Sequence, residues 1–213
     1  MKKAVCLFIA MLMLTGCLCS CKKDKKAEIN MSDIIAETGV TPENVTVTDQ
    51  KTDYVMIDVR EYGKIVIHLY PDAAPITVEN FKKLVSEHFY DGIIFHRVIK
   101  DFMIQCGDPG GDGTGGSSEK IKGEFSANGV ENPIKHVRGT VSMARTQVYD
   151  SASSQFFICQ ADYSYGDGQY AAFGFVVSGM DVVDAIADVK TNSNNKPRTD
   201  VVIDTIRFVE VSK

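Results

Sequence analysis

Apolar and polar side chains alternate along residues 55–60, where valine and isoleucine take every second position. A similar alternation returns along residues 64–69, after a connection of three residues at 61–63. Because neighbouring side chains of a strand point to opposite faces of a sheet, a period of two predicts a strand that is buried on one face. The two runs and their short connection therefore predict a β-hairpin.

The pattern then changes to the period of a helix. Apolar residues recur three or four positions apart at Val78, Phe81, Leu84, Val85 and Phe89. Thr77, two residues after Pro75, is the N-cap that we expect, and the Asp-Gly pair at residues 91–92 ends the run. A second helix is predicted for residues 180–189, whose apolar positions Val182, Val183, Ile186 and Val189 share one face.

Six further segments have the pattern of short strands, at residues 93–99, 102–106, 139–144, 155–160, 171–177 and 202–211. With the hairpin, the chain has eight predicted strands and two predicted helices. Eight antiparallel strands can close into a barrel whose interior is filled by side chains. We therefore expect a mainly-β fold, a closed eight-stranded antiparallel barrel capped by two α-helices. A β-sandwich fits the same pattern, and the pattern alone does not exclude it.

The start of the chain has the pattern of a targeting segment. Lys2 and Lys3 precede an almost wholly apolar run at residues 4–16, which is too short to span a bilayer comfortably. The run ends in Leu-Thr-Gly followed by Cys17, which resembles the lipobox of bacterial lipoproteins. We therefore expect a signal peptide at residues 1–16 and acylation of Cys17. Cys21 is a second candidate for the acylated residue, and an ordinary signal peptide with a chance cysteine is the alternative.

A polar segment connects this signal to the patterned part of the chain. Four lysines lie within residues 22–26, directly after the expected lipid site, and are typical of a solvated tether that anionic lipid headgroups attract. Residues 27–52 are polar and weakly patterned. We therefore expect three parts: the signal peptide, a lipidated N-terminus and linker at residues 17–53, and one domain at residues 54–213.

Composition limits the classes of partner. The chain has 213 residues, 44% of them hydrophobic, which is enough for one good core. Its net charge is −5, and it becomes −7 once residues 1–16, with two lysines and no acids, are removed. No basic stripe lies outside residues 22–26, which argues against nucleic acid as a partner.

Cysteine usage does not indicate a disulfide framework. Four of the six cysteines, Cys6, Cys17, Cys19 and Cys21, lie in or just after the expected signal. Only Cys106 and Cys159 fall in the domain, in apolar strand-like runs, where we expect them to be buried as small hydrophobic residues. Whether these two cysteines pair cannot be derived from the sequence.

Signals for nucleophilic or metal chemistry are weak. The domain has no G-x-S-x-G motif, no H-x-x-x-H and no C-x-x-C, and the serines near residue 151 read as a turn. The loop at residues 108–119 has acids at positions 1, 5 and 12 of a calcium loop, but Gly110 leaves position 3 without a ligand. No G-K-[ST] follows it either. We therefore expect neither metal nor cofactor. The glycines of residues 108–119 are expected to let the backbone turn and pass close to a neighbouring group.

Four blocks of sequence carry a family resemblance: FHRVIKDFMIQ at 95–105, GTVSMAR at 139–145, SSQFFI at 153–158 and DGQYAAFG at 167–174. Together they resemble the cyclophilin family of peptidyl-prolyl cis-trans isomerases, of the bacterial type, from about Tyr54 to Val211. The family fold is an eight-stranded antiparallel barrel with a helix at each end, in agreement with the pattern above.

The resemblance implies that Arg97 is the catalytic residue. Rotation about an X–Pro bond breaks no bond, so it needs a group that binds the twisted amide, and a guanidinium directed at the prolyl nitrogen can do this. The substrate-binding residues that it implies are Phe102, Met103, Gln105, Ala144, Arg145, Gln155, Phe157, Tyr165 and Tyr170. Tyr165 stands where cyclosporin-sensitive members carry Trp, and Gly166 where Leu is common. A plain apolar core, with Arg97 paired to Asp101 or Asp108, is the structural alternative.

These features predict a peptidyl-prolyl isomerase that is lipid-anchored in a bacterial cell envelope, facing the periplasm or the surface, and that assists the folding of exported proteins. Its partners would be proline-containing polypeptides and, through the N-terminal lipid, a membrane. We expect a monomer. The alternative from another class is a proline-peptide-binding chaperone or scaffold whose turnover is incidental. A calcium-binding surface protein rests on residues 108–119 alone.

Overall fold

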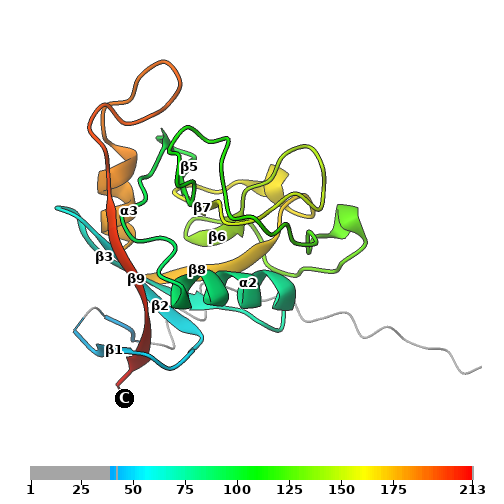
Figure 1. Ribbon diagram of the computed structural model, residues 1–213, viewed down its shortest axis with the longest axis horizontal. Helices are drawn as coiled ribbons and strands as arrows, with labels where there is room; N and C mark the ends of the chain where they lie inside the picture. Colours follow the sequence, from blue (N-terminus) through cyan, green and yellow to red (C-terminus); the bar gives the residue numbers. More distant parts are fainter. Residues whose placement is uncertain (1–38, 42, 213) are drawn as a thin grey trace, which may run out of the picture.

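The computed structural model describes residues 39–41 and 43–212 (Figure 1). The predicted signal peptide, Cys17 and the first part of the predicted linker lie outside the described residues. Within the described residues, two α-helices, two 3-10 turns and nine strands follow in the order β1 Val45–Thr48, β2 Tyr54–Val59, β3 Gly63–Leu69, α2 Pro75–Ser86, β4 Arg97–Ile99, β5 Met103–Cys106, η1 Ser126–Asn128, β6 Thr140–Met143, β7 Phe156–Cys159, η2 Ser164–Gly166, β8 Ala172–Ser178, α3 Met180–Ala187 and β9 Ile203–Val211. None of the helices in this part of the chain is long and apolar enough to cross a membrane.

The nine strands form one antiparallel sheet in the order β1-β9-β2-β3-β8-β6-β7-β5-β4. A mainly-β fold with two helices is thus confirmed, and the predicted hairpin is β2 with β3. The closed eight-stranded barrel is not confirmed, because no ladder joins the edge strands β1 and β4. The segments that lead into β4 and β9 meet only at the isolated bridge of Ile94 with Val202 and its flanking backbone hydrogen bonds.

The ninth strand is β1, which the sequence analysis assigned to the linker. It pairs with β9, where Val45 lies opposite Val211 and Thr48 lies opposite Phe208. Its four residues Val-Thr-Val-Thr bury little surface, and Val47 is exposed. The strand therefore depends on hydrogen bonds to a partner more than 150 residues away, which no local pattern could indicate.

The interior of the sheet is a continuous apolar core. The inward residues of the hairpin, Ile57, Ile65, Ile67 and Leu69, are fully buried. Phe81 of α2 packs edge-on against Phe156 with ring centroids 5.4 Å apart. Cys106 and Cys159 are free and buried, and burial raises the pKa of the Cys159 thiol to about 12, so both behave as small apolar side chains. A smaller cluster around Met103, Phe157 and Cys159 lies apart from this core.

Helix α2 receives its N-terminal cap from a distant carboxylate. The helix begins at Pro75 with Ala74 as N-cap, so Thr77 is not the cap that we expected, and Ala74 offers no capping side chain. Buried Glu124 takes that role, accepting hydrogen bonds from the backbone N–H of Ile76 at 3.1 Å and of Thr77 at 2.8 Å, and from the Thr77 hydroxyl at 2.7 Å. A carboxylate at this end also complements the helix dipole.

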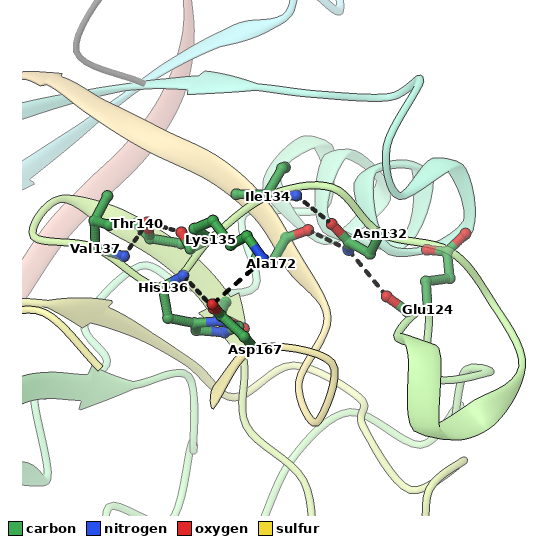
Figure 2. Close-up of polar contacts among 10 residues, drawn as sticks. Glu124, Asn132, Ile134, Lys135, His136, Val137, Thr140, Asp167 and Ala172 are labelled. Atoms are coloured by element: carbon green, nitrogen blue, oxygen red, sulfur yellow. Dashed lines mark hydrogen bonds and ion pairs between the residues drawn. The ribbon is translucent and has the colours of Figure 1, made fainter. Parts of the chain in front are cut away.

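The loop that carries Glu124 is in turn tied to the sheet. Figure 2 shows the Asn132 side-chain amide between this loop and β8, donating to the Glu124 carbonyl oxygen at 2.9 Å and to the Ala172 carbonyl oxygen at 2.8 Å. The Asn132 side-chain oxygen accepts from the N–H of Ile134 at 3.1 Å. One asparagine thus joins the carboxylate loop, the sheet and the chain that leads to β6.

Replacing Glu124 by alanine should lower the free energy of unfolding by about 2–3 kcal/mol, because hydrogen bonds to a charged group are lost and their donors stay buried. Urea unfolding followed by circular dichroism measures this change. Glu119→Ala is the matched control, since the ion pair of Glu119 with Lys83 lies on the surface. Equal unfolding midpoints for Glu124→Ala and the wild type would contradict the capping role.

Candidate active site

A pocket of about 280 Å³ opens beside Arg97. Its lining brings together eight of the predicted site residues: Arg97, Phe102, Met103, Gln105, Ala144, Arg145, Phe157 and Tyr170. Five lining residues were not predicted: His96, Asp112, Gly113, Tyr163 and Asn194. Gln155 lines an adjoining pocket, whereas Tyr165 lines neither.

Strand register explains how residues far apart in the sequence meet here. Arg97 on β4 lies opposite Gln105 on β5, Gln105 lies opposite Phe157 on β7, and Phe157 lies opposite Ser142 on β6. Directly opposed residues of antiparallel strands point to the same face of the sheet. Four strands therefore present one row of side chains. Arg97 and Gln105 form part of the wall of the pocket, and Phe157 forms its floor.

Arg97 is held by a neutral amide. Its Nη1 donates to Gln105 Oε1 at 3.1 Å, and its guanidinium carbon lies 6.0 Å from the Phe102 ring centroid. Among the described residues, no carboxylate forms an ion pair with Arg97, so the pairing with Asp101 or Asp108 that we considered is not present. The charge and most of the N–H donors of Arg97 therefore remain available to a ligand.

The amide of Gln105 is itself fixed by a second glutamine. Gln105 Nε2 donates to Gln155 Oε1 at 2.9 Å. Gln155 Nε2 donates to the backbone carbonyl oxygens of Gly113 at 3.0 Å and Gly115 at 2.8 Å. The chain of hydrogen bonds thus runs from the guanidinium through two amides to the glycine-rich loop, and it fixes which atom of Gln105 faces Arg97.

Asp108 shapes the glycine-rich loop. Its buried carboxylate accepts the backbone N–H groups of Gly110 at 2.8 Å, Gly113 at 2.6 Å and Asp112 at 3.1 Å. Burial raises the pKa of Asp108, but these donors outweigh it and hold the pKa below its ordinary value. A Cβ at Gly115 would collide with this carboxylate, so the glycine permits the close approach. Since Asp108 already accepts these bonds, the structure supports a self-supporting turn and not a calcium loop.

A serine, a histidine and an aspartate lie in the order of a catalytic triad beneath the pocket. His136 Nε2 lies 2.9 Å from Ser142 Oγ. His136 Nδ1 lies 3.2 Å from Asp167 Oδ1, which also accepts the His136 backbone N–H (Figure 2). Ser142 is 0% exposed and His136 is 1% exposed. A hydroxyl without surface access cannot attack a substrate, so this arrangement does not support hydrolysis.

The buried histidine instead supports the pocket floor. Its ring is nearly parallel to the Phe157 ring, with centroids 6.1 Å apart, and meets Tyr163 and Tyr170 edge-on. Burial lowers the pKa of His136 against the opposing effect of Asp167, so the ring is neutral near pH 7. A neutral ring can donate from one nitrogen and accept at the other, which fits its two partners.

Tyr163, and not Tyr165, contributes the aromatic wall. Tyr165 is 86% exposed, whereas Tyr163 lines the pocket with its ring centroid 4.7 Å from that of Phe102. Residues 164–166 form a 3-10 turn, in which positions three apart share a side. Gly166 therefore faces inward with Tyr163, and a Cβ there would lie 2.7 Å from the Tyr163 ring and 2.8 Å from His136. The absence of a side chain at Gly166 leaves the space that Tyr163 fills.

His96 is a buried member of the pocket wall that the sequence analysis passed over. Neither of its ring nitrogens has a hydrogen-bond partner within residues 39–41 and 43–212. Burial lowers the pKa of His96, and nearby Asp108 opposes this effect.

Asn194 also lines the pocket and was not predicted. It comes from a polar loop almost 100 residues further along the chain, so only the tertiary fold could bring it here.

Comparison with known proteins agrees with this site. Residues 54–208 match the model of the cyclophilin type peptidyl-prolyl cis-trans isomerase/CLD family. A peptidyl-prolyl cis-trans isomerase of Acinetobacter baylyi is 42% identical over 159 residues, covering 70% of this chain and 82% of the relative. Peptidyl-prolyl cis-trans isomerase A of Dickeya dadantii is 41% identical over 157 residues, covering 70% and 80%.

A solved structure agrees as well. The crystal structure of a Cryptosporidium parvum cyclophilin type isomerase, determined in the presence of the dipeptide Ala-Pro, superposes with a TM-score of 0.67 at 30% identity. The match covers 72% of this chain and 97% of that one. With the family model spanning nearly the whole domain and isomerases matching over most of their own length, the chain belongs to the cyclophilin-type peptidyl-prolyl cis-trans isomerases.

Proposed function

We propose that Arg97 is the catalytic residue of this isomerase and that the pocket beside it binds the proline of an X–Pro bond. The observation that carries the proposal is a guanidinium that is oriented by a neutral amide and has no acidic partner in the described chain, at the edge of an aromatic pocket. The Cryptosporidium relative, crystallised with Ala-Pro, supports a proline-containing ligand.

The rotation requires no nucleophile. Amide resonance gives the X–Pro bond a barrier of about 18–20 kcal/mol, and the uncatalysed step takes on the order of tens to hundreds of seconds. In the twisted transition state the prolyl nitrogen loses conjugation and becomes a better hydrogen-bond acceptor. A donor from Arg97 at that nitrogen binds the twisted amide more tightly than either planar form, which lowers the barrier by differential binding.

The remaining lining residues divide between apolar contact and orientation. Phe102, Met103 and Phe157 would hold the proline ring and exclude water, which strengthens the hydrogen bond from Arg97. Gln105 and Gln155 would contact the substrate backbone while they orient the guanidinium. The hydrogen bonds that join the two amides to Arg97 support the orienting role, and the places of Gln105 and Gln155 in the pocket linings support contact with the substrate.

We further propose that the enzyme is a lipoprotein of a bacterial cell envelope that acts on exported proteins. The support is the apolar segment before Cys17, the lysines within residues 22–26 that could contact anionic headgroups, and the bacterial relatives. Its clients would be unfolded polypeptides on the periplasmic or outer side of the membrane, and the protein would act as a monomer.

Replacing Arg97 by alanine should reduce kcat/KM for an X–Pro peptide by about two to three decades, the effect of about 3–4 kcal/mol of lost transition-state stabilisation. A protease-coupled isomerisation assay measures this change, with circular dichroism as the control for folding. Arg97→Lys should recover little activity, because a point charge does not reproduce the planar set of donors. If folded Arg97→Ala retains near-full turnover, the assignment is wrong. If it loses turnover yet still assists the refolding of a proline-rich client, the chaperone alternative is favoured.

Removing the Tyr163 ring should lower kcat/KM by about three- to tenfold, because an aromatic contact in the pocket wall is worth about 0.5–1.5 kcal/mol beyond its buried area. Tyr165→Ala, two residues away and on the exposed side of the turn, is the matched control and should change kcat/KM less than about twofold. Tyr163→Phe should stay close to the wild type. A larger effect of Tyr165→Ala than of Tyr163→Ala would place the pocket wall at Tyr165.

Cys17→Ala should abolish incorporation of a clickable fatty acid in growing bacterial cells, whereas Cys21→Ala should leave it unchanged. Gel fluorescence after labelling gives the readout, and membrane fractionation gives an independent one. Loss of label in Cys21→Ala alone would move the lipid site to Cys21, and no label in the wild type would contradict the lipoprotein proposal.

A further inference from the structure

A second pocket of about 140 Å³ adjoins the first. The two share four lining residues, Gln105, Gly113, Ala144 and Arg145. The rest of the second pocket is polar, with walls of Thr114, Gly115, Lys120, Thr146, Ser151, Ser153 and Gln155. Four hydroxyl side chains and two cations therefore surround a space that no acidic residue lines.

The two cations of this pocket have no acidic partner in the part of the chain that the structure describes. Lys120 Nζ approaches only Ser153 Oγ, at 3.4 Å, and within the described residues neither Lys120 nor Arg145 forms an ion pair. Eight other lysines and arginines among the described residues are paired: Lys51 with Glu79, Arg60 with Asp204, Lys82 with Asp53, Lys83 with Glu119, Lys100 with Asp188, Lys135 with Asp167, Arg138 with Asp184 and Arg207 with Asp91. In a chain of net charge −5, positive charge is thus left uncompensated beside the groove.

Arg145 is also held rigidly in place. Its guanidinium lies 5.0 Å from the ring centroids of Phe125 and Tyr149 and 4.9 Å from that of Tyr170. Its N–H groups donate to the carbonyl oxygens of Gln169 at 3.0 and 2.9 Å and Thr146 at 2.8 Å. Carbonyl acceptors and aromatic faces leave its charge intact. An anionic group that enters the pocket therefore meets a cation that loses little conformational freedom.

We propose that the second pocket binds the carboxylate of an Asp or Glu side chain in the same peptide whose proline occupies the first pocket. An extended chain advances about 3.3–3.6 Å per residue, so pockets that share a wall take side chains within a few positions of each other. Lys120 and Arg145 supply the charge, and the Ser153 hydroxyl, which accepts from Lys120 Nζ at 3.4 Å, supplies a hydrogen-bond donor. The inference rests on the proposed function of the first pocket and adds a substrate class, X–Pro bonds with a nearby acidic residue.

Asp112 adds to the preference for an acidic side chain in the second pocket. It lines the first pocket but not the second, and its Oδ1 is held there by the N–H and hydroxyl of Thr114 at 2.8 and 2.7 Å. A carboxylate side chain is therefore repelled where the proline ring binds and attracted where Lys120 and Arg145 lie. The charges thus favour one register of an acidic peptide along the groove.

The test uses the mature chain and a set of short peptides around one Ala-Pro bond, with Glu, Gln or Lys placed in turn at each flanking position. In the wild type, kcat/KM for Glu over Gln should rise about three- to fivefold at one position, as expected for a charge pair near the surface. This ratio should fall toward one at about 1 M salt, where charges are screened within about 3 Å.

Lys120→Glu should invert the preference at that position so that the Lys peptide becomes the better substrate. Lys122→Glu is the matched control, since it makes the same change of charge two residues away, lines neither pocket and should keep the wild-type ratio. Equal kcat/KM for Glu and Gln at every position, or an unchanged ratio in Lys120→Glu, would overturn the inference. Turnover of the Gln peptides reports separately on the isomerase itself, because it does not depend on the charge of the second pocket.

Discussion

The site depends on a guanidinium that is oriented without being neutralised. A carboxylate would hold Arg97 more strongly than Gln105 does, but it would also occupy its donors and cancel its charge. The neutral amide avoids both effects. Its orientation must itself be held by hydrogen bonds, because rotation of a side-chain amide exchanges its oxygen and its nitrogen. Gln155 provides that support at 2.9 Å, and the carbonyl oxygens of the glycine-rich loop hold Gln155. The loop is in turn shaped by Asp108. One hydrogen-bond network therefore orients the Arg97 guanidinium without cancelling its charge. It consists of the loop glycines, Gln105, Gln155 and Asp108.

The floor of the pocket shows how burial decides function. Ser142, His136 and Asp167 have the connectivity of a hydrolytic triad, yet the serine has no exposed surface. The groups that would activate a nucleophile at a surface are here hydrogen-bonded to one another inside the protein. They hold the His136 ring against the ring of Phe157. A functional assignment therefore rests on access and surroundings as much as on residue types.

Cationic side chains have different partners at the groove than elsewhere on the described surface. Cations elsewhere, such as Arg60 and Arg138, form ion pairs with carboxylates, whereas the cations at the groove face carbonyls, amides and rings. Such partners orient a cation without cancelling its field, so the positive potential of an otherwise acidic protein is concentrated where a peptide chain would lie. Arg145 lines both pockets, so the proposed sites for the proline and for its acidic neighbour would meet at this residue.

The sequence by itself determined the hairpin, the first helix and the mainly-β class, because period and turn residues are local. Most of the pocket residues followed from the resemblance of its motif blocks to the cyclophilin family. It could not determine that Val45–Thr48 is a strand or that Glu124 caps α2, since each depends on a group far along the chain. It also could not determine that Gln105, and no acidic residue of the described chain, holds Arg97, because Asp101 and Asp108 lie just as near in the sequence. Tyr165 was expected in the pocket and Tyr163 lies there instead, because the 3-10 turn and the space above Gly166 decide which ring faces inward. Local patterns report which faces are buried, and only the tertiary structure decides what each buried group meets.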